Sequence, residues 1–441
     1  MRSRKRFACV CATTATRCFL AIVLLPLATG RFASAQVEHV IHIFANAPDG
    51  WEPNAGLVAD QAGNLYGTTV VGGSFQCCGS VFELSPPTSR GGAWTEWVIY
   101  SFTQANDGGQ YPMGTLLIDH QGNLYGTTLA NQIKDGFGGG SIVFELSPPA
   151  TPGGTWSKAD LYKFPTSQKI GADARGNLIM DGLGDLFATT SQGEDNAPGE
   201  IFELRPPAIT GSRWRRVTLH NFGAAGDGAN VNNNLIMRHG SIYGTTYMGG
   251  AGGKGTVFEL KQVSGVWRER VIYSFIGSEA AFPRAGLTFD SAGNLYGTTL
   301  GGGTAKCQCG VVFKLSPPVA SGDAWTETTL YSFTDGKDGG YPLASLIVDK
   351  AGNLYGTASG GGLRNTLTNN NGTVFELSPP TATGVAWTLT TLHEFGGPAY
   401  GDGRTPLGEL FALKGKLYGT TFVGGDTLAG GGGIVFEISP P

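Results

Sequence analysis

Residues 38–44 read Glu-His-Val-Ile-His-Ile-Phe, and residues 96–102 read Glu-Trp-Val-Ile-Tyr-Ser-Phe. The later stretch is the fourth strand pattern of a repeating unit, whereas the earlier one stands before any complete unit. At the other end, the sequence stops at Pro441 after a third strand pattern, with no fourth one following. One surplus strand therefore matches one missing strand. This arrangement is expected of a ring that closes by pairing its first strand into its last unit, which leaves no open sheet edge.

The repeating unit occurs seven times. A Tyr-Gly-Thr-Thr motif, or a close variant, begins at Tyr66, Tyr125, Phe187, Tyr243, Tyr296, Tyr355 and Tyr418. A Val-Phe-Glu-Leu motif places its phenylalanine at Phe82, Phe144, Phe202, Phe258, Phe313, Phe375 and Phe436. Successive units are 53 to 63 residues apart, and each holds four short strand patterns. We therefore predict an all-β, seven-bladed β-propeller of four-stranded blades, with residues 36–441 forming a single domain.

The composition agrees with many short strands joined by tight turns. Of 441 residues, 71 are glycine and only 15% are charged, while 41% are hydrophobic, which is enough to bury a core. The glycines follow no Gly-X-Y period and there are no long Ala/Glu/Lys/Leu stretches, which excludes collagen and disfavours a helical bundle.

The first 35 residues are typical of a secretory signal. A basic stretch containing Arg2 and Lys5 precedes an apolar run at residues 18–30, and Ala33-Ser34-Ala35 forms a small-x-small cleavage site. We expect cleavage near Ala35 and a secreted protein, extracellular or periplasmic. No later run reaches the length of a membrane span, so we expect no transmembrane segment in the mature chain.

Removing this segment makes the chain strongly acidic. Residues 1–35 carry six basic residues and no acidic ones, so residues 36–441 have a formal charge of −10. A surface of that sign repels phosphate backbones, and we expect no nucleic-acid partner.

Loop lengths vary on one face only. The distance from tryptophan to the phenylalanine that ends the fourth strand is 8 residues in all six copies, whereas the connection between the second and third strands changes length from unit to unit. The second-to-third and fourth-to-first connections share a face, here called the variable face, where binding loops usually accumulate. Five Asp-Gly pairs lie in the fourth-to-first loops, at Asp49, Asp107, Asp227, Asp338 and Asp402.

Two interpretations of these aspartates remain open. They could surround the channel mouth and coordinate Ca²⁺ or sugar hydroxyls. Alternatively, each simply forms a turn with a glycine at a special dihedral angle. No Asp-x-Asp-x-Asp loop occurs in any unit, so we predict no cofactor, and Ca²⁺ is the only ion that these loops suggest.

Four cysteines remain after signal removal, at Cys77, Cys78, Cys307 and Cys309. An even number in an exported chain favours disulfides. The two pairs lie in equivalent second-to-third loops of units one and five, which are not neighbours in a seven-fold ring, so we expect local bridges. Zinc is disfavoured because no histidine accompanies either pair.

No catalytic constellation emerges from the sequence. The six histidines fall in different units or on opposite strand faces, and no Gly-x-Ser-x-Gly or Walker-type loop is present. We therefore expect a monomeric, non-enzymatic scaffold that binds a glycan or protein through the variable face. The alternatives are an extracellular polysaccharide lyase or hydrolase with its site at the funnel, and a purely structural envelope component.

The combined motif GNLYGTT…VFELSPP…W…LYSF…DG…P resembles the Gloeo_Verruco (GloVer) tandem repeat of bacterial choice-of-anchor proteins. The resemblance covers residues 38–441. It implies export and residence at the cell surface or outside the cell, and it supplies no catalytic residues.

Overall fold

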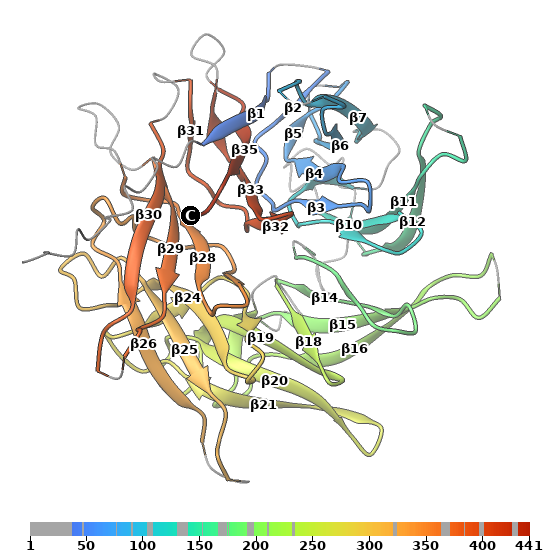
Figure 1. The fold of residues 1–441 in the computed structure, drawn as a ribbon. Helices are drawn as coiled ribbons and strands as arrows, with labels where there is room; N and C mark the ends of the chain where they lie inside the picture. Colours follow the sequence, from blue (N-terminus) through green and yellow to red (C-terminus); the bar gives the residue numbers. More distant parts are fainter. Residues whose placement is uncertain are drawn as a thin grey trace, which may run out of the picture. The chain divides into compact units, whose positions relative to one another are not determined.

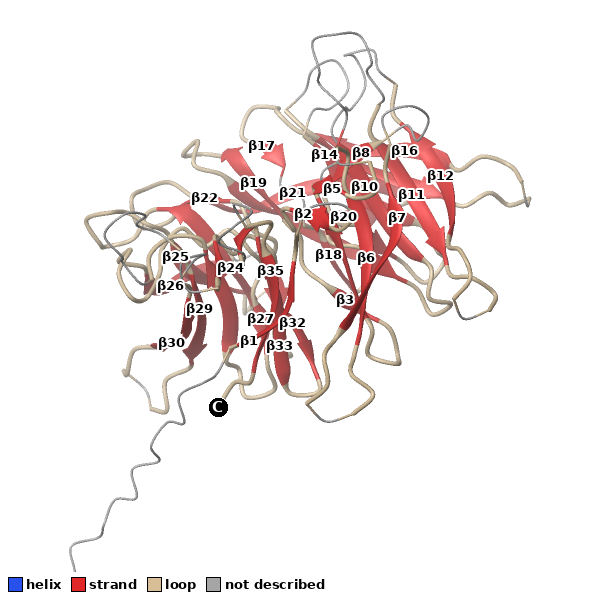
Figure 2. Ribbon diagram, turned by 90° about the horizontal axis from the view of Figure 1, so that it is seen from above, coloured by secondary structure: helices blue, strands red, loops and turns tan. Residues whose placement is uncertain are grey.

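The structure is a computed structural model that describes residues 38–441, except 46–47, 76, 90, 104–108, 130–139, 152, 166–173, 175, 192–197, 210, 232–233, 321–323, 363–370, 383, 397–400 and 426–430. The predicted signal segment and Asp107 lie outside the described residues. Residues Gln36–Pro441 form one compact unit. Every helix or strand element of the described residues is a β-strand, and loops join the strands at both ends (Figure 2).

Seven antiparallel sheets form the blades, as the repeats predict. Their strands, from the channel outward, are for blade 1 β3 (Val58–Ala59), β4 (Leu65–Thr69), β6 (Ser80–Ser85) and β7 (Thr95–Ser101); for blade 2 β9 (Leu117–Ile118), β10 (Leu124–Leu129), β11 (Ile142–Ser147) and β12 (Ser157–Lys163); for blade 3 β13 (Ile179–Met180), β14 (Leu186–Thr190), β15 (Glu200–Arg205) and β16 (Arg215–Asn221); for blade 4 β18 (Ile236–Arg238), β19 (Ser241–Gly249), β20 (Thr256–Val263) and β21 (Val266–Ser274); for blade 5 β23 (Thr288–Phe289), β24 (Leu295–Gly301), β25 (Val311–Ser316) and β26 (Thr326–Ser332); for blade 6 β27 (Ile347–Val348), β28 (Leu354–Ala358), β29 (Thr373–Ser378) and β30 (Thr388–Glu394); and for blade 7 β32 (Phe411–Leu413), β33 (Lys416–Thr421), β35 (Ile434–Ile438) and β1 (His39–Ile43).

The ring closes through the first strand of the described chain. In Figure 1 the blue β1 lies beside the red β35, and the two strands pair antiparallel with His39 opposite Glu437 and Ile43 opposite Ile434. Blade 7 is thus built from both ends of the propeller, and the prediction of closure by the N-terminal strand is confirmed.

Short additional strands connect each fourth-to-first loop with the end of a second strand. They are β2 (Gly50–Trp51) with β5 (Val71–Gly72), β8 (Gln110–Pro112) with β10, β17 (Gly228–Val231) with β19, β22 (Ala281–Pro283) with β24, and β31 (Gly403–Arg404) with β34 (Val423–Gly424). The loops of the variable face are therefore tied to the blades by backbone hydrogen bonds where they approach the channel.

A phenylalanine pair fills every blade junction. The phenylalanine of each third strand is buried and packs against the phenylalanine that follows the outer strand of the preceding blade. Their ring centroids lie 5.0 to 5.4 Å apart: Phe44–Phe82, Phe102–Phe144, Phe164–Phe202, Phe222–Phe258, Phe275–Phe313, Phe333–Phe375 and Phe395–Phe436. The glycine of the Tyr-Gly-Thr-Thr motif makes room for this ring, because a Cβ on Gly67 would lie 2.5 Å from Cζ of Phe82.

Candidate functional site

The innermost strands surround a central channel that opens on the variable face. A cavity of about 410 Å³ lies at this mouth. Its rim is formed by residues that directly follow the prolines ending the fourth-to-first loops, and these are Asn54, Met113, Arg284, Leu343 and Leu407. Because an innermost strand begins where its fourth-to-first loop ends, these side chains lie at the variable-face end of the channel.

A ring of polar residues, here called the girdle, narrows the channel below this mouth. Each girdle residue directly precedes the buried leucine of its unit, and the seven are Gly56, Thr115, Asn177, Asn234, Gly286, Ser345 and Glu409. The girdle is held by hydrogen bonds between units: Oγ1 of Thr115 accepts from the amide of Gly56 at 3.0 Å, and Oδ1 of Asn177 accepts from the amide of Thr115 at 2.7 Å.

Glu409 is the carboxylate of this girdle. Nδ2 of Asn177 donates to its Oε1 at 3.0 Å, and its Cγ lies where a side chain on Gly56 would have to begin. Burial raises the pKa of Glu409, and hydrogen bonds from Thr115, Ser345 and Asn177 partly oppose this rise. Of the described residues that line the mouth cavity, Glu409 is the one carboxylate and Arg284 the one cation.

The exposed guanidinium of Arg284 stands at the cavity rim. It lies over the ring of Tyr247, 6.0 Å from the ring centroid. Arginine offers five hydrogen-bond donors, and the girdle and rim add the amides of Asn54, Asn177 and Asn234. The mouth can therefore donate to and accept from a ligand rich in hydroxyl groups.

The backbone beside the mouth is strained at the same place in six units. The residues preceding the fourth-to-first loop's last position have positive φ angles of 56° to 61°, or 54° at Tyr341, although none is glycine; they are Glu52, Tyr111, Asn230, Phe282, Tyr341 and Thr405. Each donates its amide to a carbonyl in the second-to-third loop of the preceding blade, at 2.7 to 2.9 Å. These bonds hold the loops around the mouth in a fixed, costly conformation.

The cysteines belong to this loop system. The structure pairs Cys77 with Cys78 and Cys307 with Cys309. The buried Cys78 and Cys309 occupy equivalent places, since their carbonyls accept the amides of Tyr111 and Tyr341, respectively. Each bridge therefore stiffens a loop that holds the strained segment of the next blade.

The four described Asp-Gly aspartates lie away from the cavity, toward the outer strands, and none lines the mouth. Asp49, Asp227 and Asp402 each accept from the amide of the following glycine at 2.6 to 2.7 Å and contact a histidine of the outer strand. Asp338 instead accepts from the hydroxyl of Tyr331 at 3.1 Å and from the amide of Thr334 at 2.7 Å. These contacts organise the loops.

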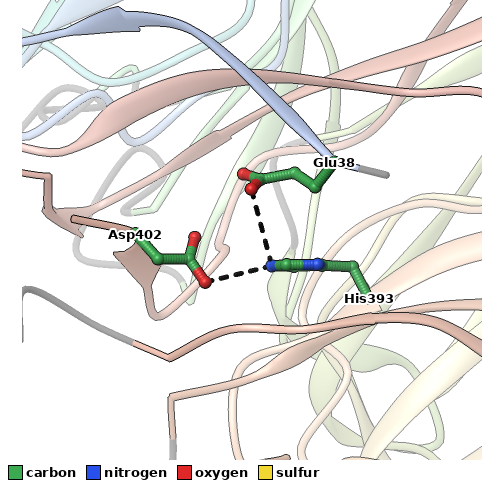
Figure 3. A group of neighbouring side chains, drawn as sticks. All are labelled: Glu38, His393 and Asp402. Atoms are coloured by element: carbon green, nitrogen blue, oxygen red, sulfur yellow. Dashed lines mark hydrogen bonds and ion pairs between the residues drawn. The ribbon is translucent and has the colours of Figure 1, made fainter. Parts of the chain in front are cut away.

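The prediction that the histidines form no constellation is wrong. His220 groups with Asp227 and Glu269, and His393 groups with Asp402 and Glu38 (Figure 3). The signal was present in the repeat. Histidine stands two residues before the phenylalanine that ends the outer strand in three units, and an Asp-Gly pair follows 7 or 9 residues later. Comparing histidines by their place in the unit, and not by their distance in sequence, would have found it.

The girdle was also missed. Its residue types differ from unit to unit, and its members come from all seven units, so no local motif marks them. The available signal was a single column of the repeat, the residue before the leucine of the innermost strand, in which flanking positions stay constant while this one varies.

Seven four-stranded blades around a polar channel define a β-propeller. The chain belongs to the Gloeobacter/Verrucomicrobia repeat family, whose model matches residues 29–212, 134–368 and 270–441. This match confirms the resemblance found in the repeats. No curated protein matches the sequence. No helix of the described residues is long and apolar enough to cross a membrane.

Several solved structures share the fold at low identity. A putative 6-phosphogluconolactonase from Bacteroides uniformis is 14% identical, with a TM-score of 0.48, over 85% of this chain and 98% of that one. PorZ, a surface component of the type-IX secretion system of Porphyromonas gingivalis, is 14% identical, with a TM-score of 0.48, over 88% of this chain and 46% of that one. The polysaccharide lyase Uly1 is 12% identical, with a TM-score of 0.48, over 93% and 94%. Nothing about the activity of the present chain follows from these similarities.

Proposed function

We propose that the protein is an exported, non-enzymatic propeller that binds a hydroxyl-rich ligand, such as a glycan, at the channel mouth on the variable face. The observation that carries this proposal is the mouth cavity of about 410 Å³, in which Asn54, Asn177 and Asn234 lie together with Arg284. Amide and guanidinium groups fixed on rigid strands suit hydroxyl recognition, and concave sites of this size are typical of small-ligand binding.

The charges of the mouth favour binding over hydrolysis. Glycoside hydrolysis generally needs two carboxyl groups roughly 5 to 10 Å apart. Among the described residues lining the cavity, Glu409 is the one carboxylate, and the girdle already hydrogen-bonds it. A polysaccharide-active enzyme is therefore the second candidate, and it is distinguished by turnover.

Export is supported by the sequence of residues 1–35, with its basic start, apolar run and Ala33-Ser34-Ala35 ending. Mass spectrometry of the protein from the native bacterium, taken from periplasm and medium, tests this part. We expect a chain that begins at Gln36, and a chain retaining residues 1–35 in the cytoplasm would contradict export.

A glycan array probed with the mature protein tests the ligand class. We expect binding to a limited set of related glycans, which mass spectrometry recovers unchanged after prolonged incubation. Cleavage of a bound glycan that Glu409→Gln abolishes would establish the enzyme instead. Binding to no glycan would contradict the proposed ligand class.

A further inference from the structure

Three blade junctions bring the same three residue types together near the outer strands. Each set contains a histidine of one outer strand, the aspartate of the following Asp-Gly loop, and a glutamate of the next blade's outer strand. The sets are His42, Asp49 and Glu96; His220, Asp227 and Glu269; and His393, Asp402 and Glu38.

Histidine and glutamate occur together at these junctions. In all three junctions whose outer strand carries histidine, the facing position is glutamate. In the other four junctions the histidine is replaced by tyrosine, and the facing residues are Lys158, Arg216, Glu327 and Leu389. The seven repeats thus behave like seven related sequences, and they link the two residue types.

Two of the sets have the geometry of a metal site. In the sets of His220 and His393, one ligand atom from each residue lies within 4.8 Å of the other two. Nε2 of His393 is 3.1 Å from Oδ2 of Asp402 and 3.8 Å from Oε2 of Glu38 (Figure 3). Ligand atoms about 2.0–2.2 Å from a tetrahedral zinc ion lie roughly 3.3–3.6 Å apart, so these distances bracket the required ones.

The glutamates of both sets lack a partner for one buried oxygen. Oε1 of Glu38 and Oε1 of Glu269 are buried without a hydrogen bond, and the Glu38 side chain is only 10% exposed. Each glutamate also faces a second carboxylate. Burial raises the pKa of Glu38 to about 7, and the charge of Asp402 adds to this rise while His393 opposes it. Buried carboxylates are normally paired or bind a metal.

The aspartates are already oriented as ligands. Oδ1 of Asp402 accepts from the amide of Gly403 and Oδ2 from that of Gly396, at 2.6 and 2.7 Å. Asp227 makes the equivalent bonds with Gly228 and Gly223. Such backbone bonds to a ligating carboxylate fix its direction and are a common feature of metal sites.

We propose that the His220–Asp227–Glu269 and His393–Asp402–Glu38 sets each bind one divalent ion of the zinc class. One imidazole and two carboxylates suit zinc, whereas Ca²⁺ prefers ligand sets made of oxygen alone. A divalent ion also balances the two carboxylates. Each ion would join two neighbouring blades. The second would hold Glu38, directly before the closing strand β1, to blade 6.

The set of His42 provides a comparison within the molecule. His42 lies 3.3 Å from Asp49, and Oε1 of Glu96 is also buried without a partner. Of the described residues, however, only the other two sets place all three ligand atoms within 4.8 Å. We therefore expect two ions per chain.

Zinc content of the mature protein tests the proposal. After removal of metal with EDTA, the protein is titrated with Zn²⁺, and bound zinc per chain and the melting temperature are measured. We expect two zinc ions per chain and a higher melting temperature with zinc. Glu38→Gln and Glu269→Gln should each lower the count to one, with at least a tenfold loss of affinity at the altered site. The double variant should bind none.

Glu327→Gln serves as the matched control, because Glu327 holds the same strand position but faces a tyrosine, Tyr273. It should still bind two ions. Circular dichroism of the metal-free variants checks that they fold. The absence of zinc uptake by the folded parent protein would overturn the proposal, since the sets would then hold only protons. Two ions retained by the double variant would also overturn it.

Discussion

The ring of Phe44 packs edge-on against the ring of Phe82, with centroids 5.0 Å apart. Phe44 follows β1 in the last blade, whereas Phe82 lies on β6 of the first blade. The same contact occurs at the other six junctions, so the junction that closes the ring uses the interaction that joins all other blades. The hydroxyl of Thr420 supports it by donating to the carbonyl of Ala55 at 2.8 Å.

Replacing Phe44 by alanine should weaken the whole propeller. Phe44 is 1% exposed, and Phe→Ala in a core removes roughly 3–5 kcal/mol of stability. Denaturant unfolding of Phe44→Ala should show a loss in that range. Phe222→Ala, at the junction of blades 3 and 4, is the matched control and should show a similar loss. A loss below about 1 kcal/mol for Phe44→Ala alone would mean that the closing strand is only loosely attached.

The two disulfides should contribute little to global stability. They close loops of one or two residues, and the chain-entropy model assigns so short a loop only about 1 kcal/mol. We expect a small decrease in unfolding free energy on addition of a reductant. Peptide mapping of the oxidised protein should find Cys77 joined to Cys78 and Cys307 to Cys309. A peptide linking the two loops would contradict the local pairing.

Glu409 should make the stability of the propeller depend on pH. Its folded pKa is raised above the ordinary value of 4.5, so its favourable contribution is complete below pH 4.5 and is lost as the pH rises through the folded pKa. Glu409→Gln removes this loss while keeping an acceptor for Asn177. Urea unfolding should therefore show that the variant gains stability relative to the parent protein between pH 4 and pH 7. An equal difference at both pH values would contradict this account.

The fold could be predicted from the sequence because its information is repeated. Seven copies of Tyr-Gly-Thr-Thr and Val-Phe-Glu-Leu mark the second and third strands, and the surplus stretch at 38–44 specifies the closure. Packing follows the same repeat, since each phenylalanine requires the glycine opposite to it. These interactions are local to a unit or identical between units, so reading one unit explains seven.

The candidate sites were harder to predict because they join residues from different units. Thr115, Asn177 and Glu409 meet only when the ring closes, and Glu38 reaches His393 only because β1 belongs to blade 7. The Asp-Gly aspartates were visible, but their positions toward the outer strands depend on the loop path from the outer strand to the channel.

The affinity of the mature protein for its tightest glycan, measured by calorimetry before and after Arg284→Ala, tests the central claim most directly. Arg284 is exposed at the channel mouth, and a hydrogen bond to a charged group contributes about 1.5–3 kcal/mol, which corresponds to roughly tenfold or more in Kd. Lys350→Ala, in an exposed turn on the opposite face, is the control. We predict at least a tenfold weaker Kd for Arg284→Ala and an unchanged Kd for Lys350→Ala. An unchanged Kd for Arg284→Ala, with binding lost in Lys350→Ala, would contradict binding at the channel mouth.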